Sequence, residues 1–512
     1  MQKQGQKPGG TSAGSGSGGA PSGGSGGVPG GQSASSVSHS GATELISDAS
    51  LSDQSYSSTS SAQNALLVSG ATVTLSNPAV VKTGDDSGDN SDFYGTNAAV
   101  FAYNNATLNI TGGTITTDGS HANAVFAYDS GTINIADTTI TTSSNNSGGV
   151  MVTGGGTLNA TNLTVQTSGN SSAPIRSDRG GGTLTVEGGS YTSSGIGSPA
   201  IYSTADIVVR NVKLTATASE GVVIEGLNSV TLESTAVVDT NNALNGNSET
   251  YKNIFIYQSM SGDAETGTGT FTAKNSTFVT NQGDHFFVTN TTAVINLTGN
   301  KFVNNDSDGA FLRVQSGKWG TSGANGGEVT LNASAQEIIG DIVIDDISSL
   351  NLNMTGSYFK GTFDNKGTVN LVLDTDSVVV LTGDSYISSL SNAVSDNSNV
   401  YANGYKLYVN GSEVSVNQSA APESFLGDGA EVVTVEDVTV VDGGAGTASG
   451  VNVPLLVGCI VGAVVLVGAI VAVVAVAAKK GKIRGTSRYQ FISHGWCRCG
   501  TPPDAQSGTV HR

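Results

Sequence analysis

Short apolar runs alternate with polar turns along most of this chain, and the runs recur about every 25 residues. Residues 99–104 (AVFAYN) are followed by residues 124–129 (AVFAYD), and residues 106–110 (ATLNI) are followed by residues 131–135 (GTINI). A fixed period of roughly 20 to 50 residues is the signature of a solenoid. The pattern therefore predicts a repeat architecture.

Each repeat holds three apolar runs. We take one residue of the first run as equivalent from repeat to repeat, with spacings of 25, 25, 24, 26 and 22 residues: Phe101, Phe126, Met151, Ile175, Ile201 and Val223. The second run alternates strictly between apolar and polar residues, as in Leu108 and Ile110. Alternation with period two and an excess of Thr, Val and Ile indicate β-strands, and no repeat shows a helical period. Three short strands are therefore expected in each turn.

Equivalent strands stacked on one another form parallel sheets whose inward side chains make ladders of similar residues. The sequence thus predicts an all-β fold, a parallel β-helix over residues 41–416 with roughly thirteen turns. An Asn410-Gly411 turn between Tyr401–Val409 and Glu413–Val416 predicts a hairpin that closes the C-terminal end.

Four insertions interrupt the repeat, at residues 85–92, 241–251, 259–269 and 318–326. Insertions in solenoids form loops, often on the binding face. Tyr251, Tyr257 and Trp319 lie in or next to these loops and are the candidate ligand-binding aromatic residues. The acidic insertion 85–92 is either a calcium loop or a solvated acidic loop.

The two ends of the chain differ from the repeat region. Residues 1–40 form a Gly/Ser-rich segment that we expect to be disordered, with no apolar stretch typical of a signal peptide. An acidic linker, 417–452, precedes a predicted transmembrane helix over 453–478, in which residues 454–478 carry no charge. The tail, 479–512, has a net charge of +6, whereas the rest of the chain has −25. The basic tail predicts a single-pass cell-membrane protein with the β-helix extracellular and the tail cytoplasmic.

The repeated phrases 181–186 (GGTLTV) and 275–281 (NSTFVTN) resemble those of right-handed parallel β-helix proteins. That group is the pectate-lyase-like superfold, and within it the resemblance is to adhesin-like surface proteins. The resemblance covers residues 60–415 and implies the right-handed sense of winding.

The acidic repeat region disfavours nucleic acid as a partner. Its carboxylates are scattered over turns and loops, and no catalytic cluster is evident: Asp118, Asp129, Asp137, Glu187, Glu225 and Asp239. Arg176, Asp178 and Arg179 share one turn, an arrangement common in solvated turns. No catalytic residue, cofactor or metal ligand is assigned. We expect a non-enzymatic adhesin-like protein for glycan or protein ligands; the alternative is a surface polysaccharide lyase or hydrolase.

Overall fold

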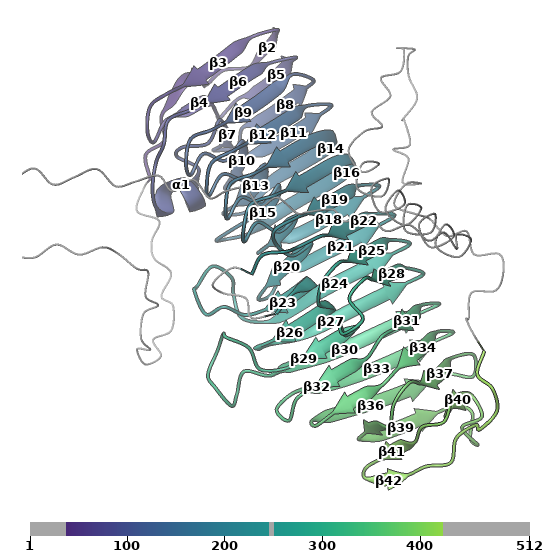
Figure 1. The fold of residues 1–512 in the computed structure, drawn as a ribbon. Helices are drawn as coiled ribbons and strands as arrows, with labels where there is room; N and C mark the ends of the chain where they lie inside the picture. The colour runs from purple at the N-terminus through teal and green to yellow at the C-terminus, as the bar shows by residue number, and fades with distance from the viewer. Residues whose placement is uncertain (1–36, 245–249, 423–512) are drawn as a thin grey trace, which may run out of the picture. The chain divides into compact units, whose positions relative to one another are not determined.

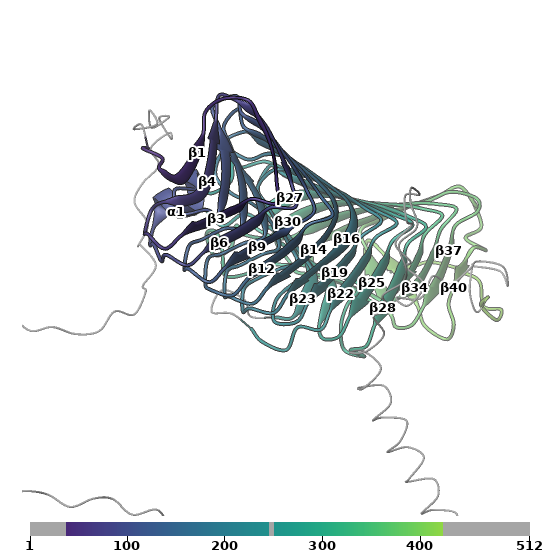
Figure 2. The same cartoon turned by 90° about the horizontal axis from the view of Figure 1, so that it is seen from above.

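The computed structural model describes residues 37–244 and 250–422. Short strands make up nearly all of its regular structure, and they pair in parallel from one turn to the next (Figure 1). The one antiparallel pair between described strands joins β41 and β42. The predicted all-β architecture of stacked parallel strands is therefore confirmed, and its arrangement is that of a parallel β-helix solenoid (Figure 2).

The first strand of each turn joins a 13-stranded sheet, called sheet A here, which agrees with the predicted number of turns. Its strands are β1 (Gly41–Leu45), β4 (Asn64–Ser69), β7 (Val100–Tyr103), β10 (Val125–Tyr128), β13 (Val150–Thr153), β15 (Ile175–Ser177), β17 (Ile201–Ser203), β20 (Val222–Glu225), β23 (Lys252–Tyr257), β26 (Asp284–Thr289), β29 (Leu312–Val314), β32 (Ile342–Ile344) and β35 (Phe363–Asn365).

The second strands, and most of the third strands, belong to a 22-stranded sheet, sheet B. In two turns a single 12-residue strand, β14 or β16, takes the place of both. The strands of sheet B are β2 (Ala49–Ser52), β3 (Ser55–Ser58), β5 (Thr72–Ser76), β6 (Ala79–Lys82), β8 (Thr107–Thr111), β9 (Thr114–Thr117), β11 (Thr132–Ala136), β12 (Thr139–Thr142), β14 (Gly156–Thr167), β16 (Gly182–Ser193), β18 (Asp206–Arg210), β19 (Lys213–Ala216), β21 (Ser229–Glu233), β22 (Ala236–Asp239), β24 (Thr268–Lys274), β25 (Thr277–Thr280), β27 (Thr291–Thr298), β28 (Lys301–Asn304), β30 (Gly327–Ser334), β33 (Ser349–Thr355), β36 (Thr368–Leu373) and β39 (Ser389–Asn392).

Two small sheets complete the C-terminal turns. Sheet C holds β31 (Glu337–Ile339), β34 (Tyr358–Gly361), β37 (Val378–Leu381) and β40 (Val400–Tyr401), and sheet D holds β38 (Ser385–Ile387), β41 (Leu407–Val409) and β42 (Ser412–Glu413). The predicted Asn410-Gly411 turn joins β41 to β42, with φ of 49° and 76°. Two positive φ values are what the two-residue turns of twisted hairpins require, so the hairpin forms as expected, although it is shorter than the predicted segments.

The core of the solenoid is a set of ladders, as the alternation predicts. Ile133 pairs with Leu108 and with Leu158, and all three side chains are fully buried. The inward residues of sheet A form a matching ladder at 0–1% exposure: Val100, Val125, Val150, Ile175, Ile201, Val222, Ile254 and Phe286. Continuous burial of apolar side chains along the axis explains how a chain with 37% hydrophobic residues sustains a core.

The register of sheet A corrects one prediction. Met151 pairs with Arg176, and Arg176 pairs with Tyr202. Ile175 and Ile201 belong to the inward ladder, one position before the residues that are equivalent to Met151. Because successive side chains of a strand point to opposite faces, the shift of one residue moves Arg176 and Tyr202 to the outer face of sheet A.

Helix α1 (Asp89–Tyr94) covers the N-terminal part of this outer face (Figure 1). The segment was predicted as a loop. The carbonyl oxygen of Phe93 accepts a hydrogen bond from Thr153 Oγ1 at 2.7 Å. Gly95 ends the helix with φ of 70°, and a Cβ atom there would lie 2.6 Å from the Phe101 ring. The outer side chains of these turns are buried in a second apolar cluster, and the His39 ring also stacks on it, 4.6 Å from the Phe101 ring. The cluster includes Leu67, Phe101, Phe126 and Met151.

The predicted Gly/Ser-rich segment falls largely outside the described residues, and the linker 417–452 mostly does so. The predicted transmembrane helix 453–478 and the basic tail lie wholly outside them. Among residues 37–244 and 250–422, no helix is long and apolar enough to cross a membrane.

Candidate functional site

An open groove of about 560 Å³ lies on the outer face of sheet A, beyond the part that α1 covers. Its floor comes from outward side chains of β15, β17, β20 and β23, and its walls come from α1 and the insertions after β23 and β29. The outer row of sheet A continues through Arg176, Tyr202, Val223 and Phe255, which pair in register. The same row that is sealed under α1 is therefore left open in these turns.

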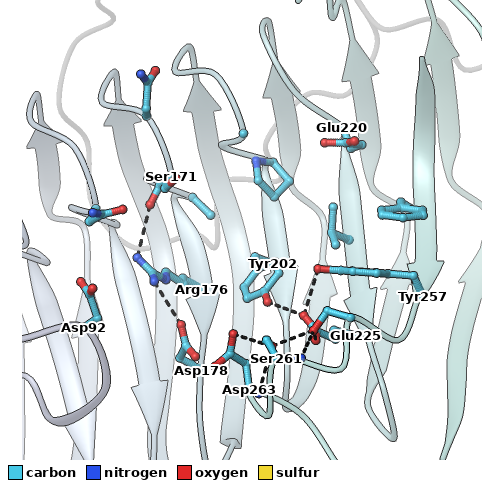
Figure 3. Close-up of a pocket in the computed structure, with 18 of the residues that line it drawn as sticks. Asp92, Ser171, Arg176, Asp178, Tyr202, Glu220, Glu225, Tyr257, Ser261 and Asp263 are labelled. Atoms are coloured by element: carbon cyan, nitrogen blue, oxygen red, sulfur yellow. Dashed lines mark hydrogen bonds and ion pairs between the residues drawn. The ribbon is translucent and has the colours of Figure 1, made fainter. Parts of the chain in front are cut away.

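Glu225, the last residue of β20, is the centre of a hydroxyl network in the groove (Figure 3). Its Oε2 atom accepts hydrogen bonds from Tyr202 at 2.6 Å and from Tyr257 at 2.9 Å. Ser259 donates a third bond to Oε1. Burial, together with the nearby Glu225 charge, raises the pKa of both phenols well above the usual value. Both tyrosines thus stay protonated and donate to the carboxylate.

Arg176 and Asp178 form a buried ion pair at the opposite end of the floor. Arg176 Nη2 lies 3.0 Å from Asp178 Oδ2, and the two side chains are 11% and 5% exposed. Burial raises the pKa of Asp178 to about 6. Arg176 lowers that pKa and the Asp263 charge raises it, but desolvation is the largest of the effects. Asp178 therefore holds its proton more strongly than an ordinary aspartic acid does.

One wall of the groove is held by Arg179. Its guanidinium carbon lies 3.8 Å from the centroid of the Phe93 ring in α1. Its Nε atom donates to Asp263 Oδ1 at 2.8 Å. Asp263 also accepts from Ser261 at 2.8 Å, and the Ser261 hydroxyl lies 2.7 Å from that of Ser259. A continuous polar chain thus connects Glu225 to α1.

Aromatic side chains form the other part of the floor. The rings of Phe255 and Tyr257 are stacked at 4.4 Å, and Tyr257 lies 6.0 Å from Trp319 with an interplanar angle of 45°. Trp319 comes from the insertion after β29 and is half-buried. Below them, Lys252 Nζ lies 3.3 Å from Glu220 Oε1 and 4.5 Å from the Phe255 ring centroid. A buried ion pair therefore lies against the Phe255 ring.

The structure places the three predicted aromatic residues in two groups. Tyr257 and Trp319 line the groove together, and Tyr257 belongs to β23, not to a loop. Tyr251 is not among the lining residues; its carbonyl oxygen instead accepts a hydrogen bond from the Asp284 amide at 3.1 Å.

Sequence reasoning missed the convergence of the charged residues. The sequence placed Arg176 and Asp178 in one turn and left Glu225 among scattered carboxylates, whereas all three line one groove. The misaligned register hid this, because it placed Ile175 and Ile201 where Arg176 and Tyr202 belong. The alternation of buried and partly exposed residues in Ile175-Arg176-Ser177 and Ile201-Tyr202-Ser203 identifies Arg176 and Tyr202 as the outward residues.

The carboxylates of the acidic insertion are engaged by protein groups. Asp86 accepts from Ser61 and Ser91, Asp92 Oδ1 lies 2.7 Å from His121 Nδ1, and Asp89 lies 3.6 Å from Arg179. Within the two described ranges, no three His, Cys, Asp or Glu side chains are grouped so that they could hold a metal ion. The calcium alternative for residues 85–92 therefore gains no support.

Comparison of the chain with known protein families, with curated proteins and with solved structures found no match.

Proposed function

We propose that the chain is a cell-surface protein that binds an oligosaccharide in the groove of sheet A. The observation that carries this proposal is the aromatic surface of Phe255, Tyr257 and Trp319 beside the buried acceptor Glu225. Sugar rings present apolar C–H faces, which stack on aromatic rings, and hydroxyl groups, which donate to carboxylates. An open site of this composition, built on a rigid scaffold and rimmed by loops, is typical of ligand recognition.

The proposal includes the arrangement expected from the sequence. The apolar segment 454–478 anchors the chain in the cell membrane, the basic tail is cytoplasmic and the solenoid displays the groove outside. The right-handed winding and the likeness to adhesin-like members of the pectate-lyase-like superfold are parts of the same proposal.

An array of immobilised oligosaccharides tests it, with the full-length chain in detergent micelles as the probe. We expect binding to a restricted set of glycans, competed by the same glycan in solution. Absence of binding to every glycan, by a chain whose circular dichroism shows folded β-structure, would exclude the proposal.

Hydrolysis of the bound glycan is the second candidate, and the raised pKa of Asp178 favours it. Asp178 directly follows β15 and Glu225 ends β20, so the two lie two turns apart. At about 4.8 Å between neighbouring strands, their backbones are about 10 Å apart. Inverting glycosidases separate the carboxyl groups of a general acid and a general base by roughly 6.5–9.5 Å, a range that this backbone spacing allows.

Mass spectrometry of glycans recovered after incubation separates the two candidates. Hydrolysis predicts shorter products that disappear with Asp178→Asn, and an activity that falls as the pH rises above about 6, where the acid loses its proton. Recovery of intact glycan at every pH would exclude hydrolysis and support binding without cleavage.

A further inference from the structure

The side chains that line the groove include more carboxylates than basic groups. One basic side chain, Arg176, lines it, against five carboxylates: Asp92, Asp178, Glu220, Glu225 and Asp263. Such a lining repels uronic acids, sialic acids and sulfated sugars, because like charges brought together in a partly desolvated site are costly. This excess of carboxylates disfavours an anionic ligand.

Glu225 differs from the other four carboxylates in its partners. Asp178 lies 3.0 Å from Arg176, Glu220 lies 3.3 Å from Lys252, and Asp263 lies 2.8 Å from Arg179. Asp92 lies 2.7 Å from the His121 imidazole. The partners of Glu225 are three hydroxyl groups, and no basic side chain of the described residues lies within ion-pair distance of it. It is 1% exposed.

A buried carboxylate without a cation carries a desolvation cost that hydroxyl donors offset only in part. A positively charged ligand group in the groove would supply the missing counter-charge. Because the surrounding protein already shields Glu225 from water, its attraction to the charged ligand group is stronger than the same attraction would be in water.

The rings around Glu225 fit a cation as well. Tyr202 and Tyr257 donate to the carboxylate (Figure 3). The rings of Phe255 and Trp319 lie 4.4 Å and 6.0 Å from the ring of Tyr257. Aromatic faces attract ammonium groups through the quadrupole of the ring, and several rings about one position make an ammonium site. The protein already shows this kind of contact, since Lys252 Nζ lies 4.5 Å from the Phe255 ring centroid.

We propose that this end of the groove is a subsite for the ammonium group of an amino sugar with a free amine, held by Glu225 and the surrounding aromatic rings. The inference rests on the proposed oligosaccharide binding and narrows its ligand class. A sugar is favoured over a lysine side chain because the groove also offers hydrogen-bonding groups along several turns, from Asn146 and Asn170 to Asp178, for a ligand longer than one side chain.

Calorimetric titration of the full-length chain with two matched oligosaccharides tests this subsite. One is a β-1,4-linked glucosamine hexasaccharide, and the other is its fully N-acetylated counterpart, which has the same backbone without the positive charges. We expect the free amine form to bind at least tenfold more tightly. That preference should shrink as salt is added, because salt screens the attraction.

Three variants test which residues cause the preference for the free amine form. Glu225→Gln keeps the size of the side chain and removes its charge, so the ratio of affinities should fall toward one. Trp319→Ala, at a half-buried loop position, should weaken binding of the free amine form about tenfold, and it provides the test if the Glu225 variant does not fold. Glu233→Gln, whose side chain is 41% exposed on β21 outside the groove, should leave the ratio unchanged.

Equal or tighter binding of the N-acetylated sugar would overturn the ammonium subsite and leave oligosaccharide binding intact. The ammonium subsite would also be overturned if the chain bound other glycans on the array but neither hexasaccharide. A lysine hexapeptide that binds the groove as tightly as the amino sugar would overturn the commitment to a sugar. Failure to bind any glycan would remove both proposals together.

Discussion

Arg179 Nε and Asp263 Oδ1 lie 2.8 Å apart, although 84 positions separate the two residues in the chain. The bond joins the turn after β15 to the insertion after β23, and the same guanidinium rests on Phe93 of α1. Two insertions that the sequence places far apart are thereby tied together along one edge of the groove.

Arg179→Gln should loosen that edge with little effect on global stability. The Arg179 side chain is 41% exposed, so its ion pairs contribute about 1 kcal/mol or less. We expect faster amide exchange in residues 258–267 and glycan binding weakened several-fold. Arg210→Gln is the matched control, because Arg210 pairs with Glu233 outside the groove at similar exposure. Unchanged exchange in 258–267 would show that the bond does not hold the insertion.

Tyr257→Phe removes one of the three hydroxyl donors to Glu225 and keeps the ring. A buried carboxylate that loses a donor costs about 1–2 kcal/mol. Urea unfolding should show a loss of that size, and glycan affinity should fall with it. Tyr386→Phe, at a position 47% exposed, should change stability by less than about 0.5 kcal/mol. Equal stability of the two variants would mean that the Tyr257 hydroxyl does not stabilise Glu225.

Trp319→Ala and Tyr251→Ala separate the candidate aromatic residues. Trp319 lines the groove and Tyr251 does not. Loss of an aromatic anchor from a binding site typically costs more than 1 kcal/mol, so Trp319→Ala should weaken glycan binding about tenfold. Tyr251→Ala should leave the affinity unchanged. If Tyr251→Ala weakened glycan binding and Trp319→Ala did not, the binding site would lie near residues 241–251 instead.

Asp239 makes stability depend on pH. Burial raises its pKa to about 8 in the folded chain, from the ordinary value of 3.8. The folded state therefore binds more protons than the unfolded state between those values, and this contribution to stability is lost as the pH rises from about 4 to 8. Asp239→Asn should be more stable than the wild type at pH 8, by roughly 1–3 kcal/mol, with a smaller difference at pH 5.

Urea unfolding at the two pH values measures that difference. Asp118→Asn, at an exposed position, is the control and should show no such dependence. If Asp239→Asn gained the same stability at both pH values, the raised pKa of Asp239 would not be the cause of that gain.

Membrane topology provides a separate prediction, based on residues 453–512. Protease added to intact cells should degrade the solenoid and spare the basic tail, because the excess of Lys and Arg retains the tail in the cytoplasm. Protection of the solenoid and loss of the tail would reverse the orientation.

The pattern of apolar and polar residues was sufficient to predict the stacked ladders of the fold, but it was not sufficient to predict the groove. Leu108, Ile133 and Leu158 could be aligned from the sequence because strict alternation fixes which side chains face inward. In the first strands, runs such as Val150-Met151-Val152 are apolar on both faces, since α1 covers the outer one, and alternation there gives no register. The one-residue error at Ile175 followed from this.

The groove also depends on contacts that no local pattern contains. Asp263 reaches Arg179 only after three turns of the solenoid have stacked, and Ser259 reaches Glu225 only once its insertion folds back over sheet A. Insertions could be located by their break in the period, but the face that they cover follows from the folded geometry.

Hydrogen–deuterium exchange of the full-length chain, with and without a saturating oligosaccharide from the array, tests the groove most directly. Residues 258–267 and 315–326 carry Ser259, Ser261, Asp263 and Trp319, and their loop amides exchange readily enough to report contact. We predict slower exchange in these two segments on binding, and no change in turns outside the groove such as residues 136–139. Unchanged exchange in both segments, or protection confined to turns outside the groove, would contradict the assignment of this face as the binding site.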